Sequence, residues 1–346
     1  MLSAKHHPLL PGSTAKILIF LSSLVLSVLQ SQPGFAQPRH LYSMAERSAM
    51  HLPLWAAKEF DIFTKYGLNV DPVAITGGAI GMQALLGGSI QVASIAAMGP
   101  INTVLAGGEP IVVGAVLNKY LLKIVARKEI QKPSDLIGKK IGITSFGGAN
   151  EFGILLALKE WKIPRSAITL LATGAAPSRV ASVQAGGTDA TVLPYSNAIM
   201  AAGKGLKTIG DLGELVPEFP DRLMIVSRSF LKKDREIVKR YIQALSESII
   251  MFKTNRDTEK GITDFGKLLR INREQAEEIY ETYKDVFSFP PRVGQKGMRA
   301  VIEIMQQQTK RPMADFELSR FLDESVIDEL EREGFFKRLE AEYLRR

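Results

Sequence analysis

Apolar and polar positions alternate in two distinct ways along this chain of 346 residues. From residue 40 to residue 227, short apolar runs alternate with segments of helical period, which is typical of parallel sheets covered by helices. Strands are predicted at 40–45, 69–75, 90–96, 111–116, 120–127, 140–144, 168–172, 190–193, 206–209 and 222–227. Helices are predicted between them at 53–66, 82–86, 100–105, 134–137, 150–161, 177–184 and 196–202.

Beyond residue 234 the helical period continues and no strand is predicted. One amphipathic helix extends to residue 252, and a second begins at Asn272, where Gln275 three residues later resembles a capping box. Two more helices are predicted at 295–307 and 323–332. Such apolar stripes usually pack on a sheet, so we assign these helices a structural role.

A pattern of glycines and small residues occurs twice. Thr76-Gly77-Gly78-Ala79 leads to Gly87-Gly88, and Thr173-Gly174-Ala175-Ala176 leads to Gly186-Gly187. Two similar α/β units imply two lobes, each with a mostly parallel sheet flanked by helices. Turns at the carboxyl ends of strands leave backbone N–H groups free at the edge where open α/β sheets bind ligands, so two such edges would form a cleft. The pairs Gly87-Gly88 and Gly186-Gly187 are expected to end helices away from that cleft.

The first 36 residues differ from the rest. Lys5 and Lys16 precede an apolar run at 17–29, and Gly34-Phe35-Ala36 follows with small residues at the −3 and −1 positions of a cleavage site. The apolar run is shorter than the roughly 20 residues that span a bilayer. We therefore expect a signal peptide cleaved after Ala36 and a mature protein in the periplasm.

The content of cysteine, histidine and charge excludes several classes of site. The chain has no cysteine, so it has no disulfide, thiol nucleophile or lipid-bearing cysteine of a lipoprotein. After the signal peptide only His40 and His51 remain, with no acidic residue at metal-ligand spacing, and we expect no metal, cofactor or catalysis. The mature chain carries 42 basic and 36 acidic residues. Because the basic residues are scattered, nucleic-acid binding is not expected.

The turn Ser145-Phe146-Gly147-Gly148-Ala149-Asn150 is the sharpest candidate site. Its two glycines let the backbone approach a ligand, and Ser145 and Asn150 supply short polar groups. A helix that begins here could donate N–H groups to an anionic or carbonyl oxygen. Alternatively, Asn150 caps the helix and Glu151 complements its dipole, and the two interpretations are compatible.

Other strands add candidates at their carboxyl ends. Thr76-Gly77 follows one strand, and the positions after other strands are Glu46, Met98 and Tyr195. Tyr195 could be a stacking wall with a polar tip or a buried core tyrosine.

The order of several short motifs resembles one family, the solute-binding proteins of nitrate/sulfonate/taurine-type ABC transporters. These proteins share a fold with the thiamine-pyrimidine synthases. The likeness covers nearly all of the mature chain and rests on 53–59 (PLWAAKE), 66–70 (YGLNV), 76–78 (TGG), 83–85 (QAL), 88–93 (GSIQVA), 135–142 (DLIGKKIG) and 228–231 (RSFL).

The resemblance implies a type II periplasmic-binding-protein fold, with two lobes joined by two crossover strands that form a hinge. Lobe 1 would comprise 37–127 and 225–346, and lobe 2 would comprise 128–224. Such a protein is a monomer that closes on a small-molecule ligand and delivers it to an ABC permease and ATPase complex. The implied ligand contacts are Glu46, Thr76, Gly77 and Met98 from lobe 1, and Ser145, Gly147, Gly148, Asn150 and Tyr195 from lobe 2.

The identity of the ligand stays open. Glu46 and Glu151 are awkward beside a sulfonate or nitrate unless they cap a helix or pair with Arg47, and an amine or ring nitrogen would suit them better. A periplasmic sensor that signals through a membrane receptor is an alternative function. A synthase-like enzyme is a further alternative, but the cysteine-rich iron motif of that group is absent.

Overall fold

The computed structural model describes residues 39–345 apart from 47, 217, 255–257 and 310–316. The predicted signal peptide, its cleavage site and Arg47 lie outside these residues. Among the helices of the described ranges, none is both long and apolar enough to cross a membrane.

Ten strands of the described chain form two groups of five. The first group comprises β1 (Arg39–Met44), β2 (Leu68–Val73), β3 (Ala93–Ile95), β4 (Pro110–Leu117) and β10 (Arg222–Ser227). The second comprises β5 (Leu122–Ala126), β6 (Lys140–Ile143), β7 (Thr169–Ala172), β8 (Ala190–Pro194) and β9 (Lys207–Asp211).

Both groups have the same strand order. The second forms a continuous sheet, β7-β6-β8-β5-β9. In the first, β1 pairs with β2, β10 lies between β3 and β4, and a parallel bridge from Ser43 to Val92 joins β1 to β3. The order is therefore β2-β1-β3-β10-β4. The first three strands of each group are parallel, and the fourth, β10 or β5, is antiparallel to its neighbours. The expected α/β fold of two similar units is confirmed.

The chain passes between the two sheets twice, before β5 and before β10. Residues 222–227 return to the first sheet, where β10 pairs with β3 and β4. The placement of the strand at 120–127 with lobe 1 was wrong, because β5 pairs with β8 and β9. The apolar residues of β4 and β5 are separated by only four residues, so the pattern gave little sign of where one sheet ends.

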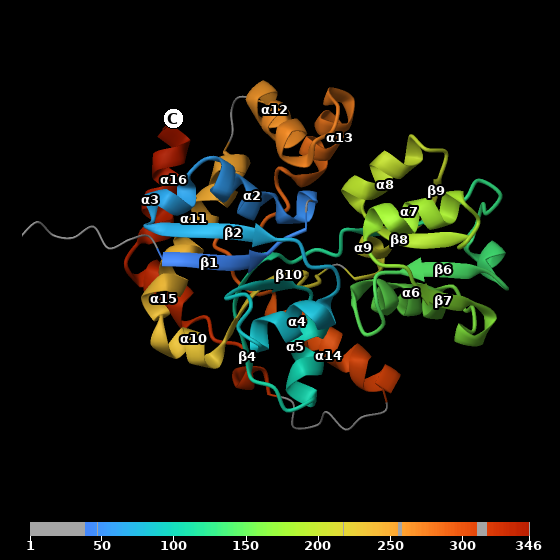
Figure 1. The fold of residues 1–346 in the computed structure, drawn as a ribbon, viewed down its shortest axis with the longest axis horizontal. Helices are drawn as coiled ribbons and strands as arrows, with labels where there is room; N and C mark the ends of the chain where they lie inside the picture. Colours follow the sequence, from blue (N-terminus) through green and yellow to red (C-terminus); the bar gives the residue numbers. More distant parts are fainter. Residues whose placement is uncertain (1–38, 47, 217, 255–257, 310–316, 346) are drawn as a thin grey trace, which may run out of the picture. The chain divides into compact units, whose positions relative to one another are not determined.

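Helices flank both sheets (Figure 1). The helices are α2 (Leu52–Glu59), α3 (Ile62–Lys65), α4 (Gly78–Leu86), α5 (Met98–Leu105), α6 (Ala149–Glu160), α7 (Ala176–Gln184), α8 (Tyr195–Ala202), α9 (Leu212–Leu215), α10 (Arg228–Lys233), α11 (Arg235–Lys253), α12 (Thr258–Leu269), α13 (Arg273–Tyr283), α14 (Gln295–Thr309), α15 (Ser325–Arg332) and α16 (Phe335–Arg345). Helices α9, α10, α12 and α16 were not predicted. The single helix predicted at 53–66 is two, because Asp61 adopts a left-handed conformation with φ of 55°.

Several predicted helix ends are confirmed. The Asn272 side chain accepts a hydrogen bond from the Gln275 N–H at 2.9 Å and caps α13. Helices α4 and α7 each end at a residue with positive φ, Gly88 and Gly186, both at 77°. Left-handed glycines of this kind satisfy the last carbonyls of a helix.

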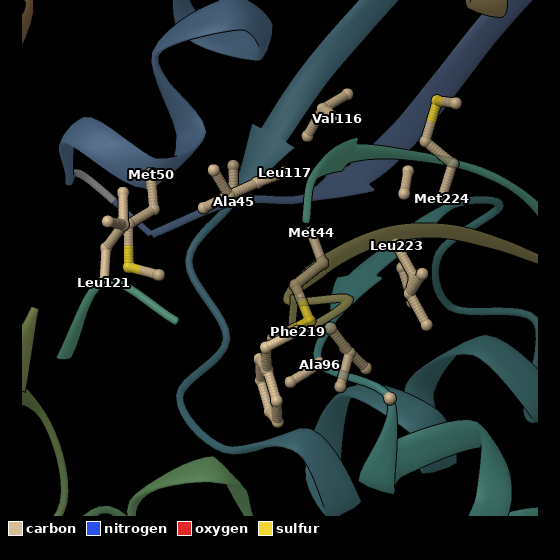
Figure 2. Close-up of a cluster of buried hydrophobic side chains, with 14 of the residues drawn as sticks. Met44, Ala45, Met50, Ala96, Val116, Leu117, Leu121, Phe219, Leu223 and Met224 are labelled. Atoms are coloured by element: carbon tan, nitrogen blue, oxygen red, sulfur yellow. The ribbon is translucent and has the colours of Figure 1, made fainter. Parts of the chain in front are cut away.

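The two crossover segments pack on each other. The rings of Tyr120 and Phe219, one from each segment, stack with centroids 3.8 Å apart. The Phe219 N–H also donates to the Asn118 carbonyl at 3.0 Å. Figure 2 shows Met44, Ala96 and Phe219 gathered together, so the core of the first sheet reaches the crossovers.

Candidate functional site

A cavity of about 90 Å³ lies where the two sheets approach each other. It is lined by residues at the carboxyl ends of β1, β3, β6 and β8, by the starts of α4, α5 and α6, and by the second crossover. Since roughly 10–15 Å³ of such volume holds one water molecule, the cavity has room for a small solute. This is the edge at which the sequence predicted a cleft.

Seven of the nine predicted site residues line this cavity. They are Glu46, Gly77, Met98, Ser145, Gly147, Gly148 and Asn150. Thr76 and Tyr195 are not among its lining residues. The Tyr195 hydroxyl donates to Asp211, and the Lys123 ammonium lies 4.5 Å from the centre of its ring. Contact of any of these residues with a ligand stays a prediction.

The turn before α6 is held by its own side chains. The Asn150 side-chain oxygen accepts hydrogen bonds from the Thr144 N–H, at 3.1 Å, and from the Thr144 hydroxyl. A Glu151 carboxylate oxygen accepts from the Gly147 N–H at 2.6 Å. The interpretation of Asn150 as the N-cap was wrong, because Gly148 occupies that position and Asn150 lies within the first turn. Asn150 instead ties the helix to the strand before it.

Arg179, in the first half of α7, lines the cavity and was missed from the sequence. Its side chain is only 3% exposed. The guanidinium donates to the Thr144 hydroxyl at 2.7 Å and to the carbonyls of Val192, at 3.2 Å, and Gly174. Burial lowers the pKa of Arg179 to about 10, still well above neutral pH, so the cavity wall holds a permanent positive charge. The sequence offered one sign that Arg179 belongs to the site, which is its position shortly after the repeated Thr173-Gly174 turn.

The second crossover brings an ion pair to the cavity. Asp221 is fully buried, and one of its carboxylate oxygens accepts from the Arg222 guanidinium. Burial raises the pKa of Asp221 to about 6, and the Arg222 charge opposes that rise. The other carboxylate oxygen is buried without a hydrogen-bond partner in the described chain. Neither Asp221 nor Arg222 was predicted as a site residue, because an adjacent acid and base at the start of a strand form no recognisable sequence motif.

His51 and Ser94 are two further polar residues that line the cavity. Its ring is buried, and its Nδ1 lies 3.2 Å from the Ser48 hydroxyl. Burial and then the Arg222 charge hold the pKa of His51 well below its usual value, so the ring is neutral at pH 7.

Glu46 follows β1, opposite Arg179 in charge. Its backbone carbonyl accepts from the Trp55 indole N–H at 3.0 Å, which fixes the loop. Within the described residues its carboxylate has no ion pair within 4.0 Å and no hydrogen bond. A pairing with Arg47, one of the conditions named for an anionic ligand, would involve a residue outside the described ranges.

One hydrogen bond joins the two sides near the cavity. The side-chain amide of Asn102, on α5, donates to the Gly147 carbonyl before α6 at 3.2 Å. A β-carbon built on Gly77 would lie 3.3 Å from the Ser145 hydroxyl, so the two turns are also close. The described conformation therefore has the two sides in contact.

Comparisons with known proteins agree with this arrangement. The taurine-binding periplasmic protein of Escherichia coli (strain K12) is 27% identical over 226 residues, which cover 64% of this chain and 69% of that protein. The solved alkanesulfonate-binding protein from Xanthomonas axonopodis pv. citri, bound to MOPS, has a TM-score of 0.68 at 19% identity and covers 79% of this chain and 94% of its own. The nitrate-binding protein from Synechocystis PCC 6803 has a TM-score of 0.60 at 15% identity and covers 68% of both chains.

At these identities the solved structures show a common fold, and the resemblance found in the sequence is confirmed. A family model described as NMT1/THI5 like matches residues 48–258, more than half of the chain. The chain therefore belongs to the NMT1/THI5-like family.

Proposed function

We propose that this protein is the substrate-binding component of an ABC-type uptake system, which takes a small solute into its cavity and delivers it to a membrane permease. The observation that carries this proposal is a cavity lined by both sheets, with Gly77 on one side and Gly148 on the other. A solute that contacts both sides favours the conformation in which they meet. The permease can then distinguish the loaded protein from the empty one.

The setting of this function follows from the relatives. The Escherichia coli relative is periplasmic by name, and we propose the same location for this chain, with a signal peptide removed after Ala36. We further propose that the protein acts as a monomer whose two sheets form separate lobes. Lobe 2 would then begin with β5 at Leu122 rather than at residue 128.

Binding without catalysis fits the residues of the cavity. The relatives named above are binding proteins. Among the residues that the structure describes, no group of three or more His, Asp or Glu side chains could hold a metal ion. The chain also lacks cysteine, which the iron motif of synthase-like enzymes requires.

A thermal-shift screen tests the proposal. The purified mature protein is melted with sulfonates, nitrate, bicarbonate, pyrimidines, aromatic acids and amines. A true solute at 100 times its Kd should stabilise the protein by about 2.7 kcal/mol. If no small molecule shifts the melting temperature, the receptor function is wrong, and if an adjacent gene encodes a sensor kinase instead of a permease and an ATPase, signalling replaces uptake.

The variant Gly148→Leu checks that the shift comes from this cavity. Gly148 has a φ of −105°, which a leucine adopts without strain, and its side chain would enter the cavity. We expect the shift by the solute to disappear while the melting temperature of the empty protein changes little. Gly203→Leu is the matched control, since Gly203 is exposed with a φ of −61°. A large loss of stability in empty Gly148→Leu would show that Gly148 serves the fold instead.

A further inference from the structure

The net charge of the chain is concentrated in the half that contains the second sheet. Residues 122–211, which hold that sheet and its helices, carry 12 basic and 6 acidic side chains. Residues 37–346 as a whole carry 42 and 36, so the remainder is neutral. The basic residues are scattered along the sequence, but the fold brings most of those in the second half to one end.

That end lies opposite the cavity. Thr144 and Pro194, at the carboxyl ends of β6 and β8, line the cavity, so the amino ends of both strands lie at the other end of the sheet. Strand β6 begins there with Lys140. Strand β5 is antiparallel to β8 and ends there, and Lys128 and Lys132 follow it. All three lysines are exposed.

Two helices bring further exposed basic residues to the same end. Because β6 and β7 are parallel, α6 runs back between them from the cavity, and Lys162 and Arg165 follow it. Helix α8 runs back from β8 in the same way, and Lys204 follows it. Lys207 then opens β9, and its ammonium donates to the side-chain oxygen of Gln131 in the segment between β5 and β6. We call these seven basic residues the basic end.

Few acidic side chains neutralise the basic end. Glu129 and Glu160 are the exposed acids there within the described chain. Asp189 pairs with Arg127, and Asp135 accepts hydrogen bonds from backbone N–H groups of its own turn. Among the described residues, no carboxylate oxygen lies within 4.0 Å of the charged nitrogens of the seven.

Basic residues around the first sheet often do have such partners. The Lys65 ammonium lies 2.7 Å from the Glu247 carboxylate, and the Lys239 ammonium lies 2.6 Å from that of Glu329. At the basic end the charges instead repel one another, and an anionic partner would relieve that repulsion.

The chemistry of the basic end fits a membrane surface. Six of its seven residues are lysines, whose compact and strongly hydrated charges suit a diffuse anionic surface, whereas the planar fork of arginine suits a single bound carboxylate or phosphate. Ile137 lies in the segment that carries Lys132 and Lys140, and it is 56% exposed. Basic residues beside an exposed apolar residue are typical of proteins that bind the interface of an anionic bilayer.

We propose that the basic end binds the surface of a membrane that contains anionic phospholipid, with its lysines against the headgroups and Ile137 in the interface. This inference goes beyond the proposed function and does not depend on it. Because the basic end lies opposite the cavity, the bound protein keeps its cavity open to solution. Attachment raises the concentration of the protein at the membrane.

Sedimentation with lipid vesicles tests the proposal on the purified mature protein. Vesicles of equal parts phosphatidylglycerol and phosphatidylcholine should bind the protein at least about tenfold more strongly than phosphatidylcholine alone, because each lysine near an anionic surface adds to the attraction. The binding should weaken as added salt screens the charges.

Two variants with the same loss of charge locate the surface. The first replaces four lysines of the basic end: Lys128→Gln, Lys132→Gln, Lys140→Gln and Lys204→Gln. Its binding to the anionic vesicles should fall at least about tenfold. The matched control replaces four exposed lysines elsewhere: Lys232→Gln, Lys233→Gln, Lys267→Gln and Lys337→Gln. It should bind within roughly twofold of the natural protein, since distant charges are screened. Both variants should melt like the natural protein, because the replaced side chains are exposed.

The variant Ile137→Ser tests the apolar part of the contact. Its binding to the anionic vesicles should fall by about three- to tenfold, because the burial of the isoleucine side chain in the interface is lost. Ile80→Ser, at a residue of α4 that is 57% exposed, is the matched control and should bind like the natural protein.

Three results would overturn the proposal. Equal binding to both kinds of vesicle would show that anionic lipid is not recognised. Equal losses in the two four-lysine variants would show that net charge acts without a defined surface. Binding to polyglutamate but not to the anionic vesicles would assign an acidic protein as the partner instead.

Discussion

Helices α4 and α7 occupy the same place in the two halves of the molecule, and their fourth residues differ completely. Each helix has nine residues, follows the edge strand of its sheet and ends at a left-handed glycine. The fourth residue of α4 is Gly81, where an added β-carbon would lie 2.5 Å from the sulfur of Met44 and 2.8 Å from the end of Ile95. The fourth residue of α7 is Arg179, whose guanidinium lines the cavity.

This difference shows how two similar α/β units can present different chemical groups to one cavity. At the α4 position there is no room for a side chain, since Met44 and Ile95 fill the space that one would need. At the α7 position the side chain ends among polar partners at the carboxyl edge of the second sheet. The two halves therefore share the architecture of the cavity, and single residues give each wall its charge.

Of the substitutions considered, replacing Arg179 is expected to have the largest effect on stability and on solute binding. Arg179→Ala should destabilise the empty protein by about 1–3 kcal/mol, because the acceptors on Thr144 and Val192 become unsatisfied. It should also abolish the thermal shift by the solute. Denaturant unfolding and titration measure the two effects. Arg179→Lys keeps the charge without the planar fork, so if it binds as well as the natural protein, the geometry of the guanidinium is unimportant.

Adding a side chain at Gly81 tests the corresponding position in the half that contains the first sheet. Gly81→Ala should destabilise the protein by about 1–2 kcal/mol, since the β-carbon must displace the ends of Met44 and Ile95 in a packed core. Urea unfolding measures it.

Gly266→Ala in α12 is the control for this substitution, because the nearest atom to its β-carbon would be 3.5 Å away. Within a helix that change should stabilise by about 0.5–1 kcal/mol. Equal effects of the two substitutions would show that close packing does not distinguish Gly81.

The smallest expected effect concerns the contact between the two sides. Asn102→Ala removes the hydrogen bond to the Gly147 carbonyl, which is worth about 0.5–1.5 kcal/mol. We expect solute release to accelerate by roughly two- to tenfold with little change in the association rate. Stopped-flow displacement measures both. A change confined to association would mean that the bond does not hold the closed conformation.

Sequence reasoning succeeded where the cause is local. A glycine after a helical stripe predicted the ends at Gly88 and Gly186, and the polar pair at Asn272 predicted a cap. It failed where distant segments meet. Nothing near Arg179 in the sequence indicates that its partners are Thr144 and Val192, and nothing near Leu122 indicates that β5 joins the second sheet.

The glycines of the candidate site were predictable because a strand that ends before a helix must turn. The charges of the cavity were only half predictable. Glu46 follows a strand and was found by that rule, but Arg179 lies inside a helix, where an arginine is usually solvent-exposed. Its burial depends on the neighbouring strands, which the local pattern does not describe.

The position of β10 has a consequence for the order in which the molecule forms during synthesis. The second sheet needs only residues 122–211 and can be completed as soon as they are free to fold. The first sheet must wait for Arg222–Ser227, because β10 is the strand that joins β3 to β4. Until then β4, whose eight residues all become buried, keeps open edges. The half that is synthesised first is thus the last to be finished, and its exposed strands need protection during that interval.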